Sequence, residues 1–159
     1  NLLLKAARLG ESAALAAASE DLRADKELML QVARLSGNAL RYMSDGMRAE
    51  RDVVLAAVEQ CGLSLEHASI EFRDDREVVL EAVKQNGFAL QFASKALRSD
   101  KLVVSEAVRQ IPLALAYARK ELRGDKDFML EMARIGNGLV LQYANIRLLS
   151  DRDVGLEAV

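Results

Sequence analysis

A 25-residue internal repeat is the feature that most constrains what this chain can fold into. The string Leu22-Arg23-Ala24-Asp25-Lys26 returns four times at intervals of 25 residues, each time with an apolar, a basic and an acidic residue in the same places. A further copy arrives one residue late, which indicates an insertion between Ala133 and Leu141. A period of this length predicts a stack of similar units that bury their apolar faces against one another. We expect an irregular loop at the insertion.

The segment after Asp25 has a helical pattern of apolar residues. Its apolar positions are Leu28, Met29, Leu30, Val32 and Ala33. At about 100° per residue these positions form one arc of about 200°, whereas alternation with period 2 would scatter them over two faces. This pattern predicts a helix, although Val-Val pairs in other copies locally favour a strand. The expected helices cover residues 26–36, 51–61, 76–86, 101–111 and 126–136.

Acidic residues precede each of these helices, where a carboxylate can accept hydrogen bonds from free backbone N–H groups. The predicted caps are Asp25, Glu50, Asp75, Asp100, Asp125 and Asp151. Glu50 is expected to be the weakest of them. Glycine follows the helix in four copies, a position typical of a left-handed helix end, at Gly37, Gly62, Gly87 and Gly138. Pro112 replaces it once, so that helix is expected to end differently, with Pro112 opening the next helix.

A shorter apolar pattern follows each glycine, with Leu40, Met43 and Met47 at i, i+3 and i+7 in the first full copy. This spacing predicts a second helix of two turns or slightly more. Helices this short are unstable alone, so stacking must supply their burial. We therefore expect residues 1–159 to form one all-α domain, a right-handed α-solenoid of about six 25-residue helix-turn-helix repeats. Both ends fall inside a repeat, so we also expect a segment of a longer chain.

One copy carries a specific string, from Phe72 to Ser94: Phe-Arg-Asp-Asp-Arg-Glu-Val-Val-Leu-Glu-Ala-Val-Lys-Gln-Asn-Gly-Phe-Ala-Leu-Gln-Phe-Ala-Ser. It resembles the family catalogued as domain of unknown function 4116. The resemblance implies tandem helical repeats of the kind that occur in large multidomain proteins of microbes and algae, with no assigned activity or catalytic residues. The chain departs from the repeat pattern at Ser105, Pro112, Arg119 and Gly155.

Composition excludes several classes of site. One cysteine rules out an intrachain disulfide or a cysteine-based zinc cluster, and one histidine rules out a multi-histidine metal site. The formal net charge of −2 argues against a protein that coats nucleic acid. With 29 % charged residues, the sequence is too interrupted for a membrane span. We predict no catalytic, metal or cofactor residues and no small-molecule substrate. The localisation stays open, since a lone cysteine is compatible with a reducing compartment and any targeting segment would precede residue 1.

Single residues that could carry chemistry have structural explanations. His67 shares a column with Tyr42, Phe92, Tyr117 and Tyr143, which favours a packing role over that of a general base. Nothing near Cys61 in the sequence would activate a thiol, so an ordinary half-exposed cysteine is favoured. Successive acidic caps are expected about 9–10 Å apart, which is too far for two of them to share a cation.

Two columns of basic residues should run along one edge. The first is Arg23, Arg48, Arg73, Arg98 and Arg123, and the second is Lys26, Arg51, Arg76, Lys101, Lys126 and Arg152. Acidic neighbours such as Asp25 and Glu27 cancel their charge. Ion pairs within and between repeats are therefore favoured over phosphate binding, and a network of them could fix the stacking register.

A regular core combined with a surface that varies between copies favours a scaffold. We expect a non-catalytic protein that binds another protein, as an accessory subunit or a segment of a larger assembly. The candidate contacts are Ile70, Ile146, Glu66, Gln91 and Gln142. The alternative is single-stranded nucleic-acid binding along the aromatic and arginine columns. An enzyme ranks third, because no nucleotide-binding glycine motif occurs.

Overall fold

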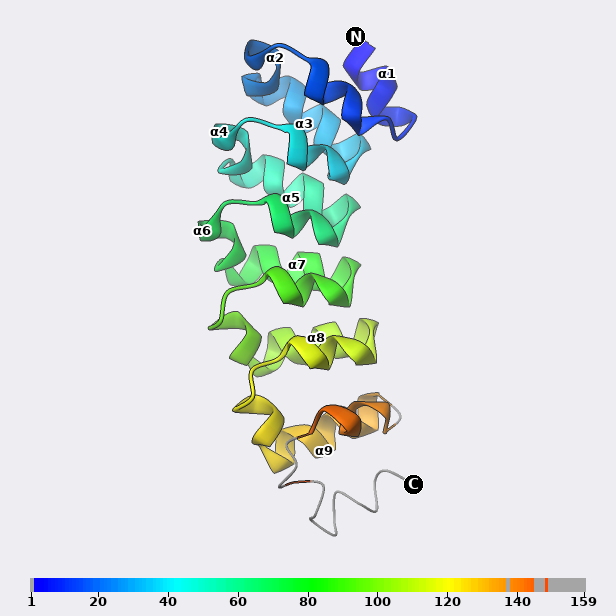
Figure 1. The fold of residues 1–159 in the computed structure, drawn as a ribbon, viewed down its shortest axis with the longest axis vertical. Helices are drawn as coiled ribbons and strands as arrows, with labels where there is room; N and C mark the ends of the chain where they lie inside the picture. Colours follow the sequence, from blue (N-terminus) through cyan, green and yellow to red (C-terminus); the bar gives the residue numbers. More distant parts are fainter. Residues whose placement is uncertain (1, 137, 145–147, 149–159) are drawn as a thin grey trace.

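The computed structural model describes residues 2–136, 138–144 and 148 of the chain. Every regular element within these residues is helical, and they contain no strand. Regularly spaced helix–turn repeats pack on one another in the order of the sequence, so the molecule is elongated along the direction of stacking (Figure 1). The prediction of an all-α fold is confirmed.

Each full repeat contains a long α-helix, a 3₁₀ helix and a short helical turn. The long helices are α1 (Leu2–Arg8), α3 (Lys26–Leu35), α5 (Arg51–Gln60), α7 (Arg76–Gln85), α8 (Lys101–Gln110) and α9 (Lys126–Ile135). The 3₁₀ helices that follow them are η1 (Ser12–Ala17), η2 (Gly37–Tyr42), η3 (Gly62–His67), η4 (Gly87–Phe92), η6 (Pro112–Tyr117) and η8 (Leu139–Tyr143). The short turns are α2 (Glu20–Ala24), α4 (Asp45–Arg48), α6 (Ile70–Arg73), η5 (Leu97–Ser99) and η7 (Leu122–Gly124).

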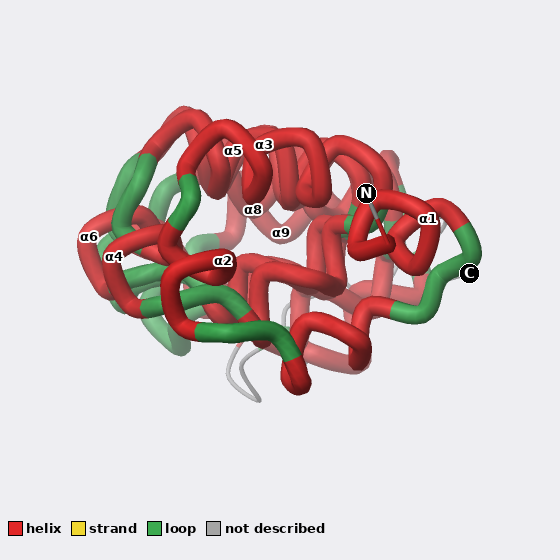
Figure 2. The backbone as a smooth tube through the Cα atoms, turned by 90° about the horizontal axis from the view of Figure 1, so that it is seen from above, coloured by secondary structure: helices red, strands yellow, loops and turns green. Residues whose placement is uncertain are grey.

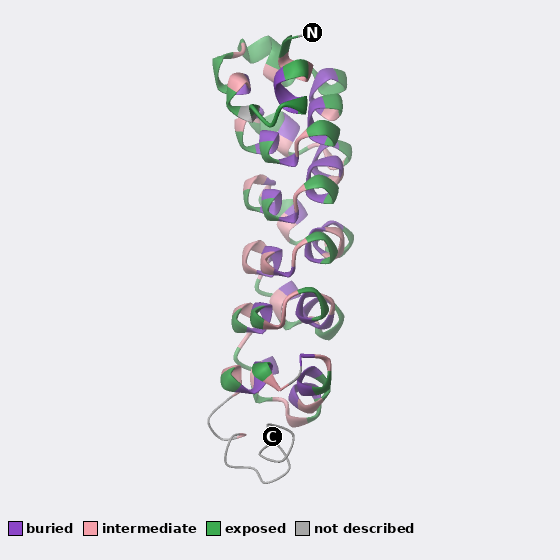
Figure 3. Cartoon of the chain, turned by 90° about the vertical axis from the view of Figure 1, so that its right-hand side faces the viewer, coloured by how far each residue is buried: buried purple, intermediate pink, exposed green. Residues whose placement is uncertain are grey.

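These three kinds of element occupy three places in the stack. The long helices contact one another in one layer and the 3₁₀ helices form a second layer, as seen from above in Figure 2. The short turns lie along one side of the molecule, at the left in Figure 1. Buried residues alternate with exposed ones along the elements of the stack (Figure 3). In α5, for example, Val53, Val54, Ala57 and Val58 are fully inaccessible to water.

The long helices begin at the predicted residues and end one residue earlier than predicted. Asp25 accepts a hydrogen bond from the Leu28 N–H at 3.0 Å, and Asp75, Asp100 and Asp125 cap their helices in the same way. Glu50 makes no capping hydrogen bond, so it is the weakest cap, as expected. Asp151 lies outside the described residues.

The predicted continuous second helix is wrong. In the first full repeat, η2 stops at Tyr42, and the backbone of Met43 and Ser44 is extended before α4 begins. The Ser44 N–H then donates to the carbonyl of Arg23 in the preceding repeat, at 3.4 Å. Equivalent bonds recur as Ser69 N–H to Arg48, Ser94 N–H to Arg73 and Arg119 N–H to Arg98. Pairing with the neighbouring repeat replaces the hydrogen bonds that a continuous helix would have made within itself.

The glycine prediction needs a similar correction. Among the described glycines only Gly10 and Gly138 have a positive φ, so Gly37, Gly62 and Gly87 do not close helices in the left-handed conformation. The long helices α3, α5, α7 and α8 end instead in an extended residue, and these include the helix before Pro112, which was expected to end differently.

Close packing between repeats explains the three glycines. A Cβ atom on any of them would lie closer than 3.0 Å to a backbone carbonyl oxygen of the next long helix, at Ala57, Ala82 and Ala107 respectively. Glycine is required here because its Cα touches the neighbouring repeat.

Two local predictions in this region are confirmed. Pro112 is the first residue of η6, where its missing N–H costs nothing. The insertion forms a turn in which Gly138 has φ 77° and donates to the Ala133 carbonyl at 2.9 Å. Since Pro112 brings side-chain atoms to the glycine position, α9 packs less closely on α8 than α7 does (Figure 1).

Candidate interaction surfaces

The second basic column links each repeat to the next. Its cations pair with the acidic residue that precedes the following long helix: Lys26 Nζ with Glu50 at 2.6 Å, Arg51 with Asp75, Arg76 Nε with Asp100 at 2.9 Å, and Lys101 Nζ with Asp125 at 2.6 Å. Each acid thus serves its own helix and its neighbour. The prediction of inter-repeat ion pairs is confirmed for this column.

These contacts change the protonation equilibria of the acids. The hydrogen bonds from the Lys101 ammonium and from the Phe128 N–H lower the pKa of Asp125 below its usual value. Partial burial alone would raise the pKa of Asp75, but hydrogen bonds from the Val78 N–H and from Arg51 outweigh it and lower that pKa. The carboxylates are therefore ionised at neutral pH, and the pairs are intact there.

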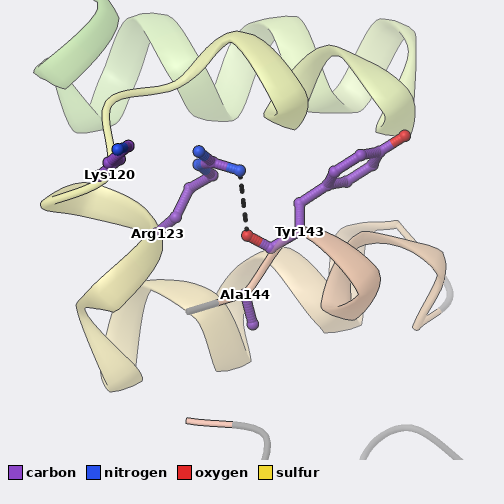
Figure 4. A pocket seen from close by; sticks show the side chains of 4 residues that line it. All are labelled: Lys120, Arg123, Tyr143 and Ala144. Carbon is purple, nitrogen blue, oxygen red and sulfur yellow. Dashed lines mark hydrogen bonds between the residues drawn. The ribbon is translucent and has the colours of Figure 1, made fainter. Parts of the chain in front are cut away.

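The arginine column has different surroundings. Nε atoms of all five arginines are buried and have no hydrogen-bond partner within the described residues. Arg48 pairs with Asp45 of its own turn, and the Nη1 of Arg123 donates to the Tyr143 carbonyl at 3.3 Å (Figure 4). The other three, Arg23, Arg73 and Arg98, have no acidic partner in the described part of the chain. In this column, the prediction of ion pairs within and between repeats is therefore met only by the within-repeat pair of Arg48, and no inter-repeat ion pair of these arginines occurs among the described residues.

We call residues 19–24, 44–49, 69–74, 94–99 and 119–124 the short-helix edge, because they contain the five short turns. Its charge is unevenly distributed. The first three stretches carry five acids, Glu20, Asp21, Asp45, Glu71 and Asp74, against the three bases Arg23, Arg48 and Arg73, a net charge of −2. The last two carry the bases Lys95, Arg98, Arg119, Lys120 and Arg123 with one acid, Glu121, a net charge of +4. We call the first three stretches the acidic half of the edge and the last two the basic half, a difference that the sequence analysis did not anticipate.

Ile70 lies at the start of α6, in the last stretch of the acidic half, next to the basic half. Its side chain is 76 % exposed, which is unusual for an isoleucine in a structure whose core is otherwise well covered. It borders a hollow of about 240 Å³ that is also lined by Asp45, Arg48, His67 and Arg73. Of the predicted contact residues, Ile70 is the one with the clearest apolar surface.

The other predicted contacts lie on the layer of 3₁₀ helices. Glu66 in η3 and Gln142 in η8 are exposed. Gln91 is half-buried, and its amide donates to the Phe88 carbonyl at 3.1 Å. Ile146 lies outside the described residues. The structure thus places Ile70 on the short-helix edge and the polar candidates on a separate face.

His67 is half-buried and makes no contact typical of a catalytic base. Burial lowers its pKa below the usual value, and Arg41 and Arg48 add to this effect against the attraction of Glu66. The ring is therefore neutral at pH 7. The other aromatic residues of the column, Tyr42, Phe92, Tyr117 and Tyr143, are partly buried against the core.

Three further observations concern the cysteine, metal binding and membrane crossing. Cys61 is a free, half-exposed cysteine whose Sγ lies 3.2 Å from Asn38 Oδ1. The described residues contain no group of three or more potential ligands arranged for a metal ion. None of the described helices has the length and apolar character needed to cross a membrane.

A recurrent serine before the short turns was not identified from the sequence. The hydroxyls of Ser19, Ser44 and Ser94 accept hydrogen bonds from backbone N–H groups three residues later, at 3.2–3.4 Å. Serine at this spacing was visible at the 25-residue period. The prediction of an unbroken helix here concealed its role as an N-cap.

Comparison with known proteins gives one family. The model for Domain of unknown function (DUF4116) matches residues 50–98 and 100–136. No curated protein and no solved structure matches the chain. The two matched segments contain α5 to α9, together with most of the short-helix edge.

Proposed function

From the premise that this chain belongs to the DUF4116 family of helical repeats, we propose that it is a non-catalytic scaffold that binds another protein. In this proposal the stack is a right-handed α-solenoid of about six 25-residue units. It serves as an accessory subunit or as one segment of a larger assembly.

The exposed side chain of Ile70 is the observation that carries the proposal. Leaving a large apolar side chain in water costs free energy that a partner can recover by covering it. Ile70 adjoins a hollow whose lining includes both an acidic residue, Asp45, and basic residues such as Arg73. An apolar contact surrounded by polar groups is the usual composition of a protein-binding site.

Nucleic-acid binding has less support. A single-strand binder stacks bases on exposed aromatic faces. Here the aromatic side chains of the column at Tyr42 pack partly against the core. The acidic half of the short-helix edge would also repel a polyanion that ran along it.

Affinity capture from an extract of the source organism tests the proposal. The wild-type chain is compared with Ile70→Ser and with a matched control, Leu102→Ser. Leu102 is 54 % exposed but lies in the layer of long helices, away from the short-helix edge. We expect mass spectrometry to identify a protein that is enriched by the wild type and by Leu102→Ser and lost with Ile70→Ser. If no protein depends on Ile70 in this way, the proposed contact is wrong.

A further inference from the structure

The two basic columns have different roles in the structure. Cations of the second column are engaged in inter-repeat ion pairs, for example Lys101 with Asp125. In the basic half of the short-helix edge, by contrast, Lys95 and Lys120 are exposed and have no ion-pair partner among the described residues. Within the described residues, the charges of Lys95 and Lys120 therefore form no ion pair between repeats.

The arginines beneath these lysines are fixed by packing. Arg98 and Arg123 are half-buried, and their Nε atoms are covered by neighbouring groups without a hydrogen-bond partner in the described structure. Within the described residues, Arg123 donates a hydrogen bond to a neutral carbonyl, that of Tyr143. The two guanidinium groups are thus held in place, and no carboxylate of the described residues pairs with them.

Arg123 and Lys120 also border an open hollow. It measures about 200 Å³ and is completed by Tyr143 and Ala144 (Figure 4). Lys120 and Arg123 come from the same turn of chain at one side of this space, and the Arg123 side chain extends toward Tyr143. An anionic side chain that entered the hollow would find two positive charges within reach.

We propose that the basic half of the short-helix edge binds an acidic segment of the partner protein. This inference rests on the proposed scaffold function. It specifies that the bound segment is acidic and that it lies along the short-helix edge in one orientation. The segment would place an apolar residue near Ile70 and direct its carboxylates toward Lys95, Arg98, Lys120 and Arg123. The acidic half of the edge would repel the reverse orientation.

The spacing of the repeats fits such a segment. Packed helices lie about 8–10 Å apart, so Lys95 and Lys120 occupy equivalent positions one such interval apart. Carboxylates at i and i+3 of a peptide in the polyproline II conformation lie on the same side and are separated by about 9 Å. Those at i and i+7 of a helix have a similar separation. Either form would contact one lysine from each repeat.

Fluorescence anisotropy with labelled probes tests this inference. The probes are a short glutamate-rich peptide, a lysine-rich peptide of equal length, and a single-stranded oligothymidine with the same net charge as the acidic peptide. The wild-type chain is compared with the double variant Lys95→Gln/Lys120→Gln. The control is Lys5→Gln/Arg8→Gln, which removes two positive charges from exposed positions of α1.

We expect the acidic peptide to bind the wild type and the lysine-rich peptide not to bind. The Lys95→Gln/Lys120→Gln variant should bind about fivefold more weakly, since exposed ion pairs contribute little individually and two are removed. The control variant should bind like the wild type, and added salt should weaken all binding. Far-UV circular dichroism checks that each variant is folded.

Three results would overturn the inference. They are the absence of acidic-peptide binding, an equal loss of affinity in both double variants, and tighter binding of the oligothymidine than of the peptide. The last result would identify nucleic-acid phosphates as the preferred ligand. If Ile70-dependent capture succeeds while Lys95→Gln/Lys120→Gln captures the same protein equally well, the scaffold proposal stands and the acidic-segment inference fails.

Discussion

Replacing Gly87 by alanine should disrupt the contact between two repeats. A Cβ on Gly87 would lie closer than 3.0 Å to the carbonyl oxygen of Ala107, 3.2 Å from the carbon of that carbonyl and 3.3 Å from the Cβ of Ile111. The obstructing atoms include the backbone of α8, so no change of rotamer can relieve the clash. The Ala107 oxygen also accepts the Ile111 N–H at 2.9 Å, which restricts its movement.

The expected cost is about 2–3 kcal/mol of unfolding free energy, in the upper part of the range for overpacked interiors. Gly46→Ala is the matched control, because Gly46 is exposed in α4 and its nearest neighbour to an added Cβ is Ser44 Oγ at 4.0 Å. The control should be neutral or should stabilise the chain by up to about 1 kcal/mol through helix propensity.

Urea unfolding followed by far-UV circular dichroism measures both effects. Stacked repeats are stabilised mainly by interfaces with nearest neighbours, so a weakened interface at Gly87 should also broaden or split the transition. A Gly87→Ala variant as stable as the wild type would show that the repeats can separate at no cost. The explanation of Gly37, Gly62 and Gly87 as close-packing residues would then be wrong.

Three further predictions follow from single side chains. Ser64 is 2 % exposed, and its hydroxyl has no hydrogen-bond partner within the described residues. Replacing it by alanine should therefore raise the unfolding free energy by about 1 kcal/mol. If urea unfolding shows a less stable variant instead, the hydroxyl has a hydrogen-bond partner and the reasoning is wrong. Ser105 is 9 % exposed, its hydroxyl makes no hydrogen bond to the Lys101 carbonyl among the described contacts, and a hollow of about 270 Å³ adjoins it. The equivalent residues of the other repeats are only partly buried: Leu30, Leu55, Leu80 and Leu130. The variant Ser105→Leu should therefore leave the unfolding free energy unchanged or raise it by about 1 kcal/mol. A decrease in the unfolding free energy of more than about 1–3 kcal/mol would mean that neighbouring side chains already fill the space. Because the folded-state pKa values of Asp75, Asp100 and Asp125 are lowered, the contribution of these carboxylates to folding stability is fully present above the ordinary carboxyl pKa of about 4 and is lost as pH falls through the lower folded values. Thermal unfolding should therefore show that Tm declines below pH 4, and that it declines less in Asp75→Asn. An identical decline in that variant would contradict the assignment.

The sequence by itself determined the features that depend on local patterns. The 25-residue period established the repeats, and the apolar arc established the long helices such as α3 in spite of the Val-Val pairs of other copies. Acidic caps such as Asp25 were also predictable, because an N-cap acts within three residues of its own position. The exposed Ile70 could be identified because its column is otherwise largely polar.

The tertiary structure alone decided the features that depend on the neighbouring repeat. Gly87 resembled a left-handed helix end, yet its role is to let the Ala107 carbonyl approach, a contact across 20 residues of sequence. The break after Tyr42 depends on the bond from the Ser44 N–H to Arg23 in the preceding repeat. The same holds for the two basic columns, which look alike in sequence. Only the stacking places acids opposite the second column and leaves Arg73 and Arg98 of the first without an acidic partner in the described structure.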